Sequence, residues 1–453
     1  MIESRSPQNP DDVVLTVDAS SSAEVARAAE QARLAQVDWV GGGAAARSAA
    51  LTAAAEAVAA AADELTALMV REVGKPLGEA RGEVGRSVAI LRYYAQQVFD
   101  PIGQMHQPSL KGLLYSVRHP RGIAGLITPW NFPLAIPLWK AAPALAFGNG
   151  VLLKPAPEAT ACAIRLAEII TPHLPDGLFH VLPGDVETGQ AVVQAADVVS
   201  FTGSVAAGKA VALAATARGV AVQAEMGGLN PAIVLPDANI EAAANQIAAA
   251  VAGFAGQKCT ATKRIIVVGD PTEFRDALVA AIEAQRVGDP AQAGVSAGPV
   301  IDAAARNRVT AAASSAVDAG GRILIGGNAI DGDGYFVQPT VVEGAPIDHL
   351  LACDEVFGPI ALLKTAESAE EALKVANGVR YGLAAAVYTS NLATALDLSN
   401  RLEAGLVKVN APTTGVDFYL PFGGEKDSSL GSREQGKAAQ EIYTSTHTVA
   451  IAP

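Results

Sequence analysis

Cysteine and histidine are scarce in this sequence, which has three cysteines and six histidines among 453 residues. No Cys-x-x-Cys pair occurs, and the histidines form none of the usual metal-ligand spacings. A disulfide framework and a cysteine-rich zinc site are therefore excluded, and we expect no metal centre. Unpaired cysteines suit a reducing compartment, so we predict a cytoplasmic protein.

Positive charge is also in short supply. Lys and Arg number 33 against 46 Asp and Glu, which gives a net charge of −13. Binding to nucleic acid needs a basic face, so this balance argues against it. Residues 1–12 lack the pattern of a signal peptide, and no apolar run reaches the roughly 20 residues that cross a bilayer. We predict a soluble protein that acts on a small molecule, without nucleic acid or membrane.

What the chain does contain is an ordinary globular composition, with 50% hydrophobic and 17% charged residues. A chain of this length suggests two or three domains. Residues 21–103 have helical patterning, with separate helices expected over 44–73 and 78–99. Short apolar segments alternate with helical ones from residue 122 to 201, and a second such run starts after Pro231. This alternation predicts an α/β fold with two Rossmann-like lobes, parallel sheets and a cleft between them.

Two segments fall outside the alternation. Residues 104–121 are typical of a projecting β segment, and residues 446–451 alternate between polar and apolar. The two could pair with each other, and such edge strands also invite pairing between subunits.

One cysteine stands where a reactive thiol is plausible. Cys259 lies between a glycine-containing loop and a run of small residues, before an apolar strand at residues 265–268. It can act as a nucleophile if it is reachable and if backbone N–H groups, a helix dipole or a cofactor's positive ring stabilise the thiolate. The alternative is a buried packing cysteine, the commoner role, which we assign to Cys162 and Cys353.

Two glycine-containing turns follow predicted strands and open helices. Residues 202–210 nearly match a P-loop, but Ala210 stands where a Ser or Thr must hold Mg²⁺, so we reject an NTPase. This turn, at Gly203 and Ser204, and a second at residues 183–189 each direct backbone N–H groups at an anion. At adjacent strand ends they would suit a dinucleotide pyrophosphate, although each alone could be an ordinary tight turn.

Other polar side chains end predicted strands. Lys154 can donate to ribose hydroxyls, Glu355 offers a carboxylate to a ribose diol, and Phe357 offers an aromatic face to a nicotinamide. Each pattern is weak in isolation, since a Lys-Pro pair is usually a solvated turn.

Two further residues suit acyl chemistry. Asn131, held between prolines, can donate its amide N–H to an oxyanion beside the Cys259 N–H. Glu225 lies at the expected junction of the lobes, where partial burial would raise its pKa toward a useful value for a general base. The alternatives are a turn asparagine and a surface glutamate.

Together these segments resemble the aldehyde dehydrogenase superfamily. The matches span nearly the whole chain in the family's order: Leu91-Arg92-Tyr93-Tyr94-Ala95, Thr128-Pro129-Trp130-Asn131-Phe132-Pro133, Lys154-Pro155, Phe201-Thr202-Gly203-Ser204, Glu225-Met226-Gly227-Gly228, Gly256-Gln257-Lys258-Cys259, Glu355-Val356-Phe357-Gly358-Pro359 and Pro421-Phe422-Gly423-Gly424. The resemblance implies a coenzyme domain (residues 1–103 and 121–226), a catalytic domain (227–435) and an oligomerisation arm (104–120 and 436–453). It also implies a homodimer or a homotetramer.

The same resemblance implies the site. Cys259 would be the nucleophile, Glu225 the general base and Asn131 the oxyanion donor. NAD or NADP would be the cofactor, with the preference left open, and it would be held by Thr128, Trp130, Lys154, Gly189, Phe201, Gly203, Ser204, Gly227, Glu355 and Phe357.

Within the superfamily, residues 257–262, 417–424 and 431–437 are most similar to the 2-oxoglutarate semialdehyde (2,5-dioxopentanoate) dehydrogenases. The expected reaction takes a carboxylate-bearing semialdehyde to its acid through a cysteine thiohemiacetal and thioester. Arg86 could bind the substrate's distal carboxylate, with Lys258 as a second cation, or it could be a solvated helix arginine. The apolar walls of the substrate channel would be Phe132, Trp139 and Phe418.

Other functions stay open: a general aliphatic or aromatic aldehyde dehydrogenase, a CoA-acylating dehydrogenase, or a non-catalytic nucleotide-binding relative. The acylating reaction needs no hydrolytic base, so Glu225 argues against it, and a non-catalytic relative would be expected to lose Cys259 or Glu225. Two departures from the family pattern stand out. Leu229 occupies a place where many members have Lys, and the chain starts without the usual opening strand pair, so we expect a thinner N-terminal edge.

Overall fold

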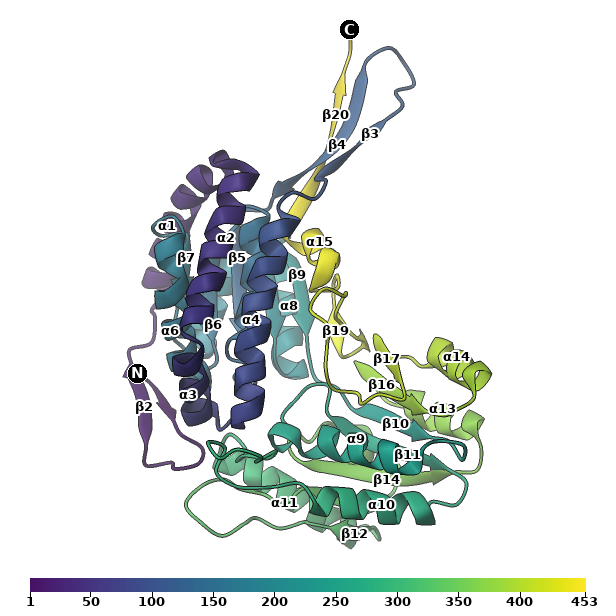
Figure 1. Ribbon diagram of the computed structural model, residues 1–453. Coiled ribbons are helices and arrows are strands. Elements are labelled where there is room, and N and C mark those ends of the chain that lie inside the picture. The colour runs from purple at the N-terminus through teal and green to yellow at the C-terminus, as the bar shows by residue number, and fades with distance from the viewer.

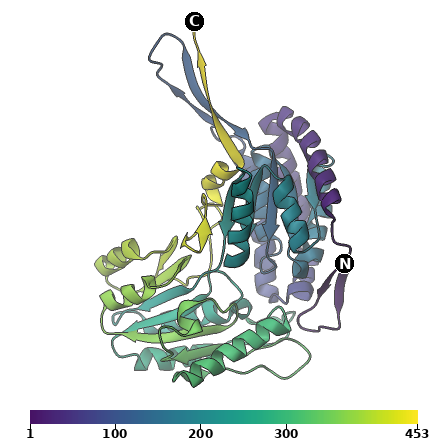
Figure 2. The same ribbon diagram turned by 180° about the vertical axis from the view of Figure 1, so that it is seen from behind.

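The structure, a computed structural model, describes residues 1–453 as two α/β bodies and a projecting β arm (Figure 1). The first body contains the purple-to-teal part of the chain, and the second contains the green part. The arm extends away from both bodies and carries the C-terminus at its tip, as the view from behind also shows (Figure 2). None of the helices combines the length and apolar character that a membrane crossing requires.

A six-stranded sheet with the order β19-β9-β8-β5-β6-β7 forms the centre of the first body. Every neighbouring pair is parallel except β19 with β9. The strands are β5 (Ile123–Thr128), β6 (Gly150–Pro155), β7 (Phe179–Val181), β8 (Val198–Thr202), β9 (Ala221–Glu225) and β19 (Ser429–Leu430). Both β5 and β6 are buried throughout, which explains their unbroken apolar runs.

Helices cover both faces of this sheet. One face packs against α1 (Ser22–Gly41), α7 (Val186–Ala195) and α8 (Val205–Ala217). The other packs against α2 (Gly43–Ala60), α3 (Ala62–Val73), α4 (Leu77–Gln97), α5 (Ala135–Ala146) and α6 (Thr160–Ile170). The helix predicted over residues 44–73 is therefore two helices, which meet at Ala61. Because strong helix formers lie on both sides of Ala61, packing rather than propensity decides where the segment bends.

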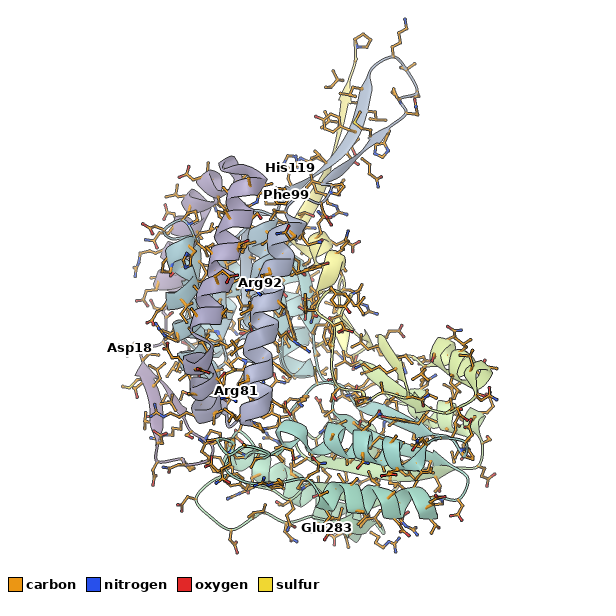
Figure 3. The ribbon with its side chains drawn as sticks, viewed as in Figure 1. Asp18, Arg81, Arg92, Phe99, His119 and Glu283 are labelled. Carbon is orange, nitrogen blue, oxygen red and sulfur yellow. The ribbon has the colours of Figure 1, made fainter.

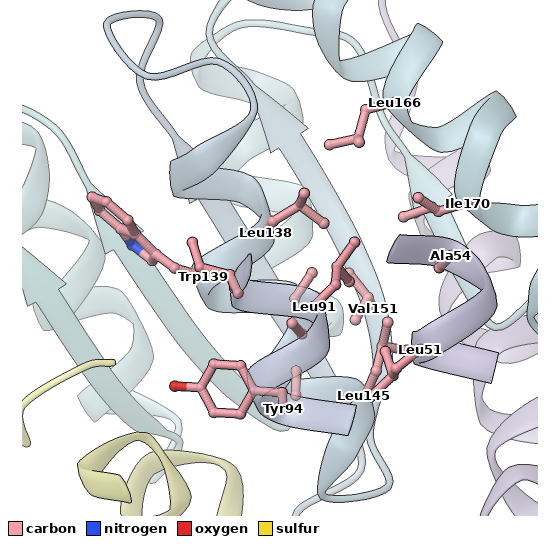
Figure 4. Close-up of a cluster of buried hydrophobic side chains, with 14 of the residues drawn as sticks. Leu51, Ala54, Leu91, Tyr94, Leu138, Trp139, Leu145, Val151, Leu166 and Ile170 are labelled. Atoms are coloured by element: carbon pink, nitrogen blue, oxygen red, sulfur yellow. The ribbon is translucent and has the colours of Figure 1, made fainter. Parts of the chain in front are cut away.

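The largest hydrophobic core lies between this sheet and α2–α6 and contains 42 buried residues. Figure 4 shows side chains from α2, α4, α5, α6 and β6 that converge there: Leu51, Ala54, Leu91, Leu138, Leu145, Val151, Leu166 and Ile170. Fully burying such a side chain contributes about 1.5–3 kcal/mol. The core thereby fixes α4 and α5, the two helices that carry Arg86 and Trp139.

The second body is built around a seven-stranded sheet with the order β12-β13-β14-β11-β10-β16-β17. Its strands are β10 (Asn230–Val234), β11 (Thr262–Val268), β12 (Arg322–Ile325), β13 (Thr340–Glu343), β14 (Ile360–Ala366), β16 (Ala384–Tyr388) and β17 (Leu406–Val409). All are parallel except β12, which pairs antiparallel with β13. The two mainly parallel sheets confirm the predicted fold class.

Helices cover both faces of the second sheet as well. On one face lie α9 (Ile240–Ala252) and α10 (Thr272–Glu283). On the other lie α11 (Ala303–Asp318), α12 (Leu350–Cys353), α13 (Ala369–Asn377) and α14 (Leu392–Arg401). A short pair, β15 (Tyr381–Gly382) with β18 (Glu425–Lys426), lies outside both sheets.

The arm is a three-stranded sheet of β3 (Gly103–His106), β4 (Leu113–Pro120) and β20 (Thr444–Ile451), in the order β20-β4-β3. The strand β20 follows the short helix α15 (Ala439–Tyr443) and pairs antiparallel with β4 along its whole length. The predicted pairing of the C-terminal segment with the early projecting segment is confirmed.

The N-terminus differs from the prediction. Strands β1 (Ile2–Arg5) and β2 (Val13–Val17) form an antiparallel pair, so the expectation of a missing opening strand pair is wrong. The polar residue Ser4 is buried on β1, where its hydroxyl donates to the carboxylate of Glu72 on α3 at 2.8 Å. Because a polar residue occupies a buried position of β1, the strand does not show the apolar alternation by which strands are predicted.

Candidate active site

A cavity of about 260 Å³ lies where loops from both bodies meet. The first body contributes the segments that follow β5, β8 and β9, which are the carboxyl ends of parallel strands, where α/β folds place ligands. The second body contributes Cys259, the start of α11 and the segment after α12. Ten of the residues selected from the sequence line this cavity: Trp130, Asn131, Trp139, Gly203, Ser204, Glu225, Gly227, Cys259, Glu355 and Phe357.

The cysteine in the cavity is the only one of the three in a position that suits chemistry. Cys259 is partly exposed to the cavity, and Asn230 donates to its backbone carbonyl at 2.8 Å. Cys162 is fully buried in the main core, as expected. Cys353, expected to be a packing residue, is exposed, because it ends the single-turn helix α12 at the surface.

The surroundings of Cys259 do not favour a thiolate. Burial, followed by the carboxylates of Glu355 and Glu225, raises the pKa of the thiol above its usual range, and the Cys259 backbone N–H only partly opposes this. Of the stabilising groups named from the sequence, the backbone N–H by itself therefore does not favour the thiolate in the protein without ligand. A base or a bound positive charge has to favour loss of the proton.

Glu225 ends β9 at the point where the chain crosses from the first sheet to the second, and only 2% of its surface is exposed. Its carboxylate accepts hydrogen bonds from Gln223 Nε2 at 3.0 Å and from the hydroxyl of Ser429. Burial, and next the nearby carboxylate of Glu434, raise the pKa of Glu225 well above its ordinary value. The alternative of a surface glutamate is excluded.

A buried hydrogen-bond chain extends from Glu225 to an ion pair. Gln223 accepts from Ser200 Oγ at 2.7 Å, and Ser200 accepts from Lys140 Nζ at 2.8 Å. Lys140 also donates to Glu434 Oε2 at 2.7 Å, and its side chain is fully buried. No motif in the sequence indicates Lys140, although a lysine within the otherwise apolar helix α5 is a usable signal of a buried ion pair.

Asn131 is 5% exposed and reaches the segment that carries the cysteine, because its Nδ2 donates to the carbonyl of Gln257 at 3.0 Å. A side-chain amide has a second N–H, which this bond leaves available. The backbone carbonyl of Asn131 accepts from Lys75 Nζ at 2.7 Å.

Lys75 belongs to a buried ion pair that fixes the Asn131 loop from both sides. Its ammonium contacts Glu83 and lies 3.8 Å from the centre of the Phe132 ring. The other oxygen of Glu83 accepts from the backbone N–H groups of Leu134 and Ala135 at 2.9 and 3.0 Å. Phe132 therefore packs on Lys75 and does not line the cavity.

At the other end of the cavity, Ser204 caps α8 by accepting from Ala207 N at 3.3 Å. A side chain at Gly203 would clash, since its Cβ would lie 2.6 Å from the Phe201 ring. The buried hydroxyl of Thr202 beside them has no hydrogen-bond partner. The cavity thus ends at a helix N-terminus with free donors and a close backbone approach, features that suit an anion.

Glu355 and Phe357 border the same space. A Cβ on Gly227 would lie 2.2 Å from Glu355 Oε2, so a side chain there would displace the Glu355 carboxylate, and Gly228 N donates to Glu355 Oε1 at 3.3 Å. Burial raises the pKa of Glu355 to about 7. The Phe357 ring meets Trp130 edge-on at 5.7 Å.

The turn at residues 183–189 is not where the sequence analysis placed it. Its strand β7 is separated from β8 by β5 and β6, so the two glycine turns do not follow adjacent strands. Gly189 lies beside Lys154, with 3.6 Å between its Cβ position and Lys154 Cδ. Lys154, Gly189, Phe201 and Thr128 stand outside the walls of the cavity.

Helix α11 and the two residues before it contribute cavity residues that no pattern in the sequence indicates. Ile301, Asp302, Ala305 and Arg308 line the cavity opposite the first body. No local motif marks them, because they reach the cavity only where the two bodies meet.

The residues proposed for the substrate are spread over a wider area. Trp139 lines the cavity, and its ring lies 5.8 Å from that of Phe422. Lys258 is paired with Glu79 at 2.8 Å, so its charge is already neutralised. Phe418 packs on Tyr93 at 5.8 Å, outside the cavity.

Arg86 is partly buried and makes no hydrogen bond or ion pair. Burial lowers the pKa of Arg86, while the carboxylates of Glu83 and Asp417 raise it. By contrast, Arg81 and Arg92 of the same helix are exposed (Figure 3).

The sequence matches the aldehyde dehydrogenase family over residues 1–449. The chain belongs to this family. It is 38% identical over 463 residues to the alpha-ketoglutaric semialdehyde dehydrogenase of Bacillus subtilis, covering 100% of this chain and 95% of the relative. It is 36% identical over 397 residues to the 2,5-dioxopentanoate dehydrogenase of Saccharolobus solfataricus, covering 86% and 83%.

Solved structures agree with this assignment. A crystal structure of the NAD-dependent aldehyde dehydrogenase from Sinorhizobium meliloti superposes with a TM-score of 0.96 at 33% identity, covering 100% of this chain and 92% of the other. The resemblance seen in the motifs is confirmed, and the chain is an aldehyde dehydrogenase.

The buried pair behind Asn131 yields a stability prediction. Lys75→Met leaves the Glu83 carboxylate buried without its cation, which costs about 3–5 kcal/mol, so Tm should fall by several degrees in a thermal scan. Replacing both partners, as Lys75→Met with Glu83→Gln, should recover much of the loss, because the glutamine oxygen can still accept from the N–H groups of Leu134 and Ala135. Arg92→Met, which breaks the exposed pair with Glu56, is the control and should change Tm little. Equal changes of Tm in Lys75→Met and Arg92→Met would contradict a stabilising role for the buried pair.

Proposed function

We propose that this chain is an NAD-dependent dehydrogenase that oxidises a carboxylate-bearing aldehyde, of the 2,5-dioxopentanoate type, to its acid. The observation that carries the proposal is the single cavity in which Cys259, Glu225 and Asn131 meet. The names of the relatives from Bacillus and Saccharolobus support the substrate class.

The residues in and around the cavity suit a nicotinamide dinucleotide. The N-terminus of α8, with Gly203, Ser204 and the unpartnered Thr202 hydroxyl, suits its phosphates. Glu355 would accept from ribose hydroxyls, and Phe357 and Trp130 would pack against the nicotinamide. Gly227 lines this cavity, and Thr128, Lys154, Gly189 and Phe201, which stand outside its walls, would contact a part of the dinucleotide that extends beyond it. When bound, the dinucleotide supplies the acceptor for hydride.

The preference for NAD over NADP is supported by charge. The carboxyl of Glu158 lies close enough to Lys154 for their charges to interact. A carboxylate near the ribose favours a free 2′-hydroxyl and repels a 2′-phosphate.

The proposed chemistry starts at Cys259. Its thiolate attacks the aldehyde carbon, and the resulting oxyanion accepts hydrogen bonds from Asn131 Nδ2 and from the Cys259 N–H. Hydride leaves that carbon, which converts the thiohemiacetal into a thioester. Glu225 then takes a proton from water, the water oxygen attacks the thioester, and the C–S bond breaks to give the acid and the free thiol.

The environment of Glu225 suits this task. A carboxylate with a strongly raised pKa is a better base near neutral pH than an ordinary one. Ser429 and Gln223 orient it, and the chain to Lys140 and Glu434 holds Gln223 in turn. A hydrolytic base so well buried and fixed favours hydrolysis over transfer of the acyl group to CoA.

Arg86 is the residue we propose for the distal carboxylate. It stands seven residues before Tyr93, two turns away on the same face of α4. That face is directed at the segment of Asp417 and Phe418, since Tyr93 contacts Phe418 and the charge of Asp417 acts on Arg86. Arg86 is thus a cation without an ion-pair partner on the face of α4 that meets Phe418, outside the walls of the cavity. Of the expected apolar walls, Trp139 lines the cavity, whereas Phe132 and Phe418 would contact only a substrate that extends beyond it. Lys258 would assist only if its pair with Glu79 opens.

We also propose that the chain divides into a coenzyme domain (residues 1–103 and 121–226), a catalytic domain (227–435) and an arm (104–120 and 436–453). The arm has unpaired outer edges on β20 and β3, which supports assembly into a homodimer or homotetramer. Three free cysteines support a cytoplasmic location.

The first test separates the two halves of the reaction. With NAD and 2,5-dioxopentanoate, Cys259→Ala should form no NADH, while Cys353→Ala, at an exposed thiol, should match the wild type. Glu225→Gln should still give one rapid equivalent of NADH but turn over about 10²–10⁴-fold more slowly, because only thioester hydrolysis lacks its base. Release of acyl-CoA on adding CoA, with no free acid formed, would instead favour the acylating reaction.

The second test uses pH. Because burial raises the pKa of Glu225, a protonated and inactive base predominates at low pH, and kcat should rise with pH until Glu225 is fully ionised. Glu225→Gln should remove this rise from the slow steady turnover. A steady rate that climbs identically in wild type and Glu225→Gln would assign the titration to another group.

The third test addresses the substrate. Arg86→Met should raise KM for 2,5-dioxopentanoate about 10–100-fold, because a hydrogen-bonded charge is worth about 1.5–3 kcal/mol. KM for an uncharged aldehyde of similar length should not change. Arg81→Met, on the exposed side of the same helix, is the control. An unchanged KM for 2,5-dioxopentanoate in Arg86→Met would remove Arg86 from the substrate site.

A further inference from the structure

The segment that leads to Cys259 is built on strained backbone. Phe254, Ala255 and Gly256 have consecutive positive φ angles of 51°, 51° and 64°. A left-handed conformation costs on the order of 1–3 kcal/mol at a non-glycine residue, and it persists only where the surroundings hold it. The structure must therefore contain groups that keep this turn in place.

One of these groups is Gln257. Its side-chain Nε2 donates to the carbonyls of Phe254 and Pro299, both at 3.2 Å, and its Oε1 accepts from Ile301 N at 2.8 Å. These bonds tie the turn to the start of α11 but not to the segment that carries Glu355.

The other group is Lys263, which follows shortly after Cys259 and lies at the start of β11. Its side chain is buried, with 3% exposed, and its Nζ donates to the carbonyl of Gly256 at 3.1 Å and to that of Gly358 at 2.5 Å. Gly256 ends the strained turn, and Gly358 follows Glu355 and Phe357. One ammonium group thus joins the nucleophile's segment to the segment proposed to bind the nicotinamide ribose.

The two segments are also in direct contact. A Cβ on Gly256 would lie 2.3 Å from the Gly358 carbonyl oxygen, so the backbones approach as closely as glycine permits. Two carbonyl oxygens brought together in this way repel each other, and a shared cation between them removes the repulsion.

The charges of Lys263 and Glu355 stabilise each other. Burial lowers the pKa of Lys263 to about 8, and the Glu355 carboxylate opposes this effect. In turn, Lys263 lowers the pKa of Glu355, which burial raises to about 7. A buried ammonium is costly unless it is paired or hydrogen-bonded, and no step proposed for the reaction uses its proton.

We propose that Lys263 is a positioning residue that sets the spacing between the Cys259 thiol and the Glu355–Phe357 segment, and thus between the aldehyde carbon and its hydride acceptor. The inference rests on the proposed function. Lys263 touches neither the substrate nor the cavity wall, so its effect is exerted through the two carbonyls.

If Lys263 has this role, its loss should affect aldehyde oxidation and ester hydrolysis differently. Oxidation of an aldehyde requires the thiol and the hydride acceptor to be held in register, and a misplacement of about 1 Å can cost about 10²-fold in rate. Hydrolysis of an activated ester such as p-nitrophenyl acetate requires only Cys259 and Glu225, because the ester forms the thioester without loss of hydride.

The experiment compares both activities in wild type, Lys263→Met and Lys263→Gln. In Lys263→Met, single-turnover NADH formation should fall about 100-fold, while ester hydrolysis stays close to wild type and KM for NAD changes less than kcat. Lys263→Gln, which retains an N–H donor, should recover part of the hydride transfer. Lys364→Met, a partly exposed lysine on β14, is the matched control and should change neither activity.

Equal losses of both activities in a folded Lys263→Met or Lys263→Gln protein would overturn the proposal and leave a purely structural lysine. Wild-type hydride transfer in both variants would overturn it as well. If Lys263→Met does not fold, the ratio of the two activities in Lys263→Gln decides by the same criterion. Failure of the proposed function would be visible separately, as a wild-type protein that hydrolyses the ester but reduces no NAD with any aldehyde.

Discussion

Buried charge is the constraint on which the rest of the site depends. Glu225 and Glu355 are carboxylates kept out of water, and burial raises the pKa of each. Three buried ammonium groups, on Lys75, Lys140 and Lys263, lie behind them. Removing a partner from such a group leaves an uncompensated charge in a medium of low polarity, so each pair fixes the backbone around it.

Each of the three lysines stabilises a different part of the site. Lys75 holds the loop of Asn131, Lys140 begins the hydrogen-bond chain that ends at Glu225, and Lys263 joins the segment before Cys259 to that of Glu355. Each connects elements from different parts of the chain, because long flexible side chains can reach carbonyls and carboxylates that the sheets bring close. The cavity is thereby fixed before any ligand enters it.

Much of the fold could be predicted because patterns of neighbouring residues specify its helices and strands. The capping box of Ser21 and Glu24 marks the start of α1, and unbroken apolar runs mark β5 and β6. The polarity of β1 hid it, because Ser4 is buried against a carboxylate rather than against apolar side chains. The order of strands in a sheet is not local either, which is why the turn at residues 183–189 was placed beside the wrong strand.

The sequence by itself determined the two-lobed α/β fold, the family, and which side chains stand at Cys259, Glu225 and Asn131. Motifs of neighbouring residues are enough to indicate each of these. Only the tertiary structure decided how those groups behave. Lys140 and Glu434 are 294 residues apart, and Asn131 and Gln257 are 126 apart. Burial and pairing over such separations set pKa values, and they exist only in the folded chain, where the two bodies meet at the cavity.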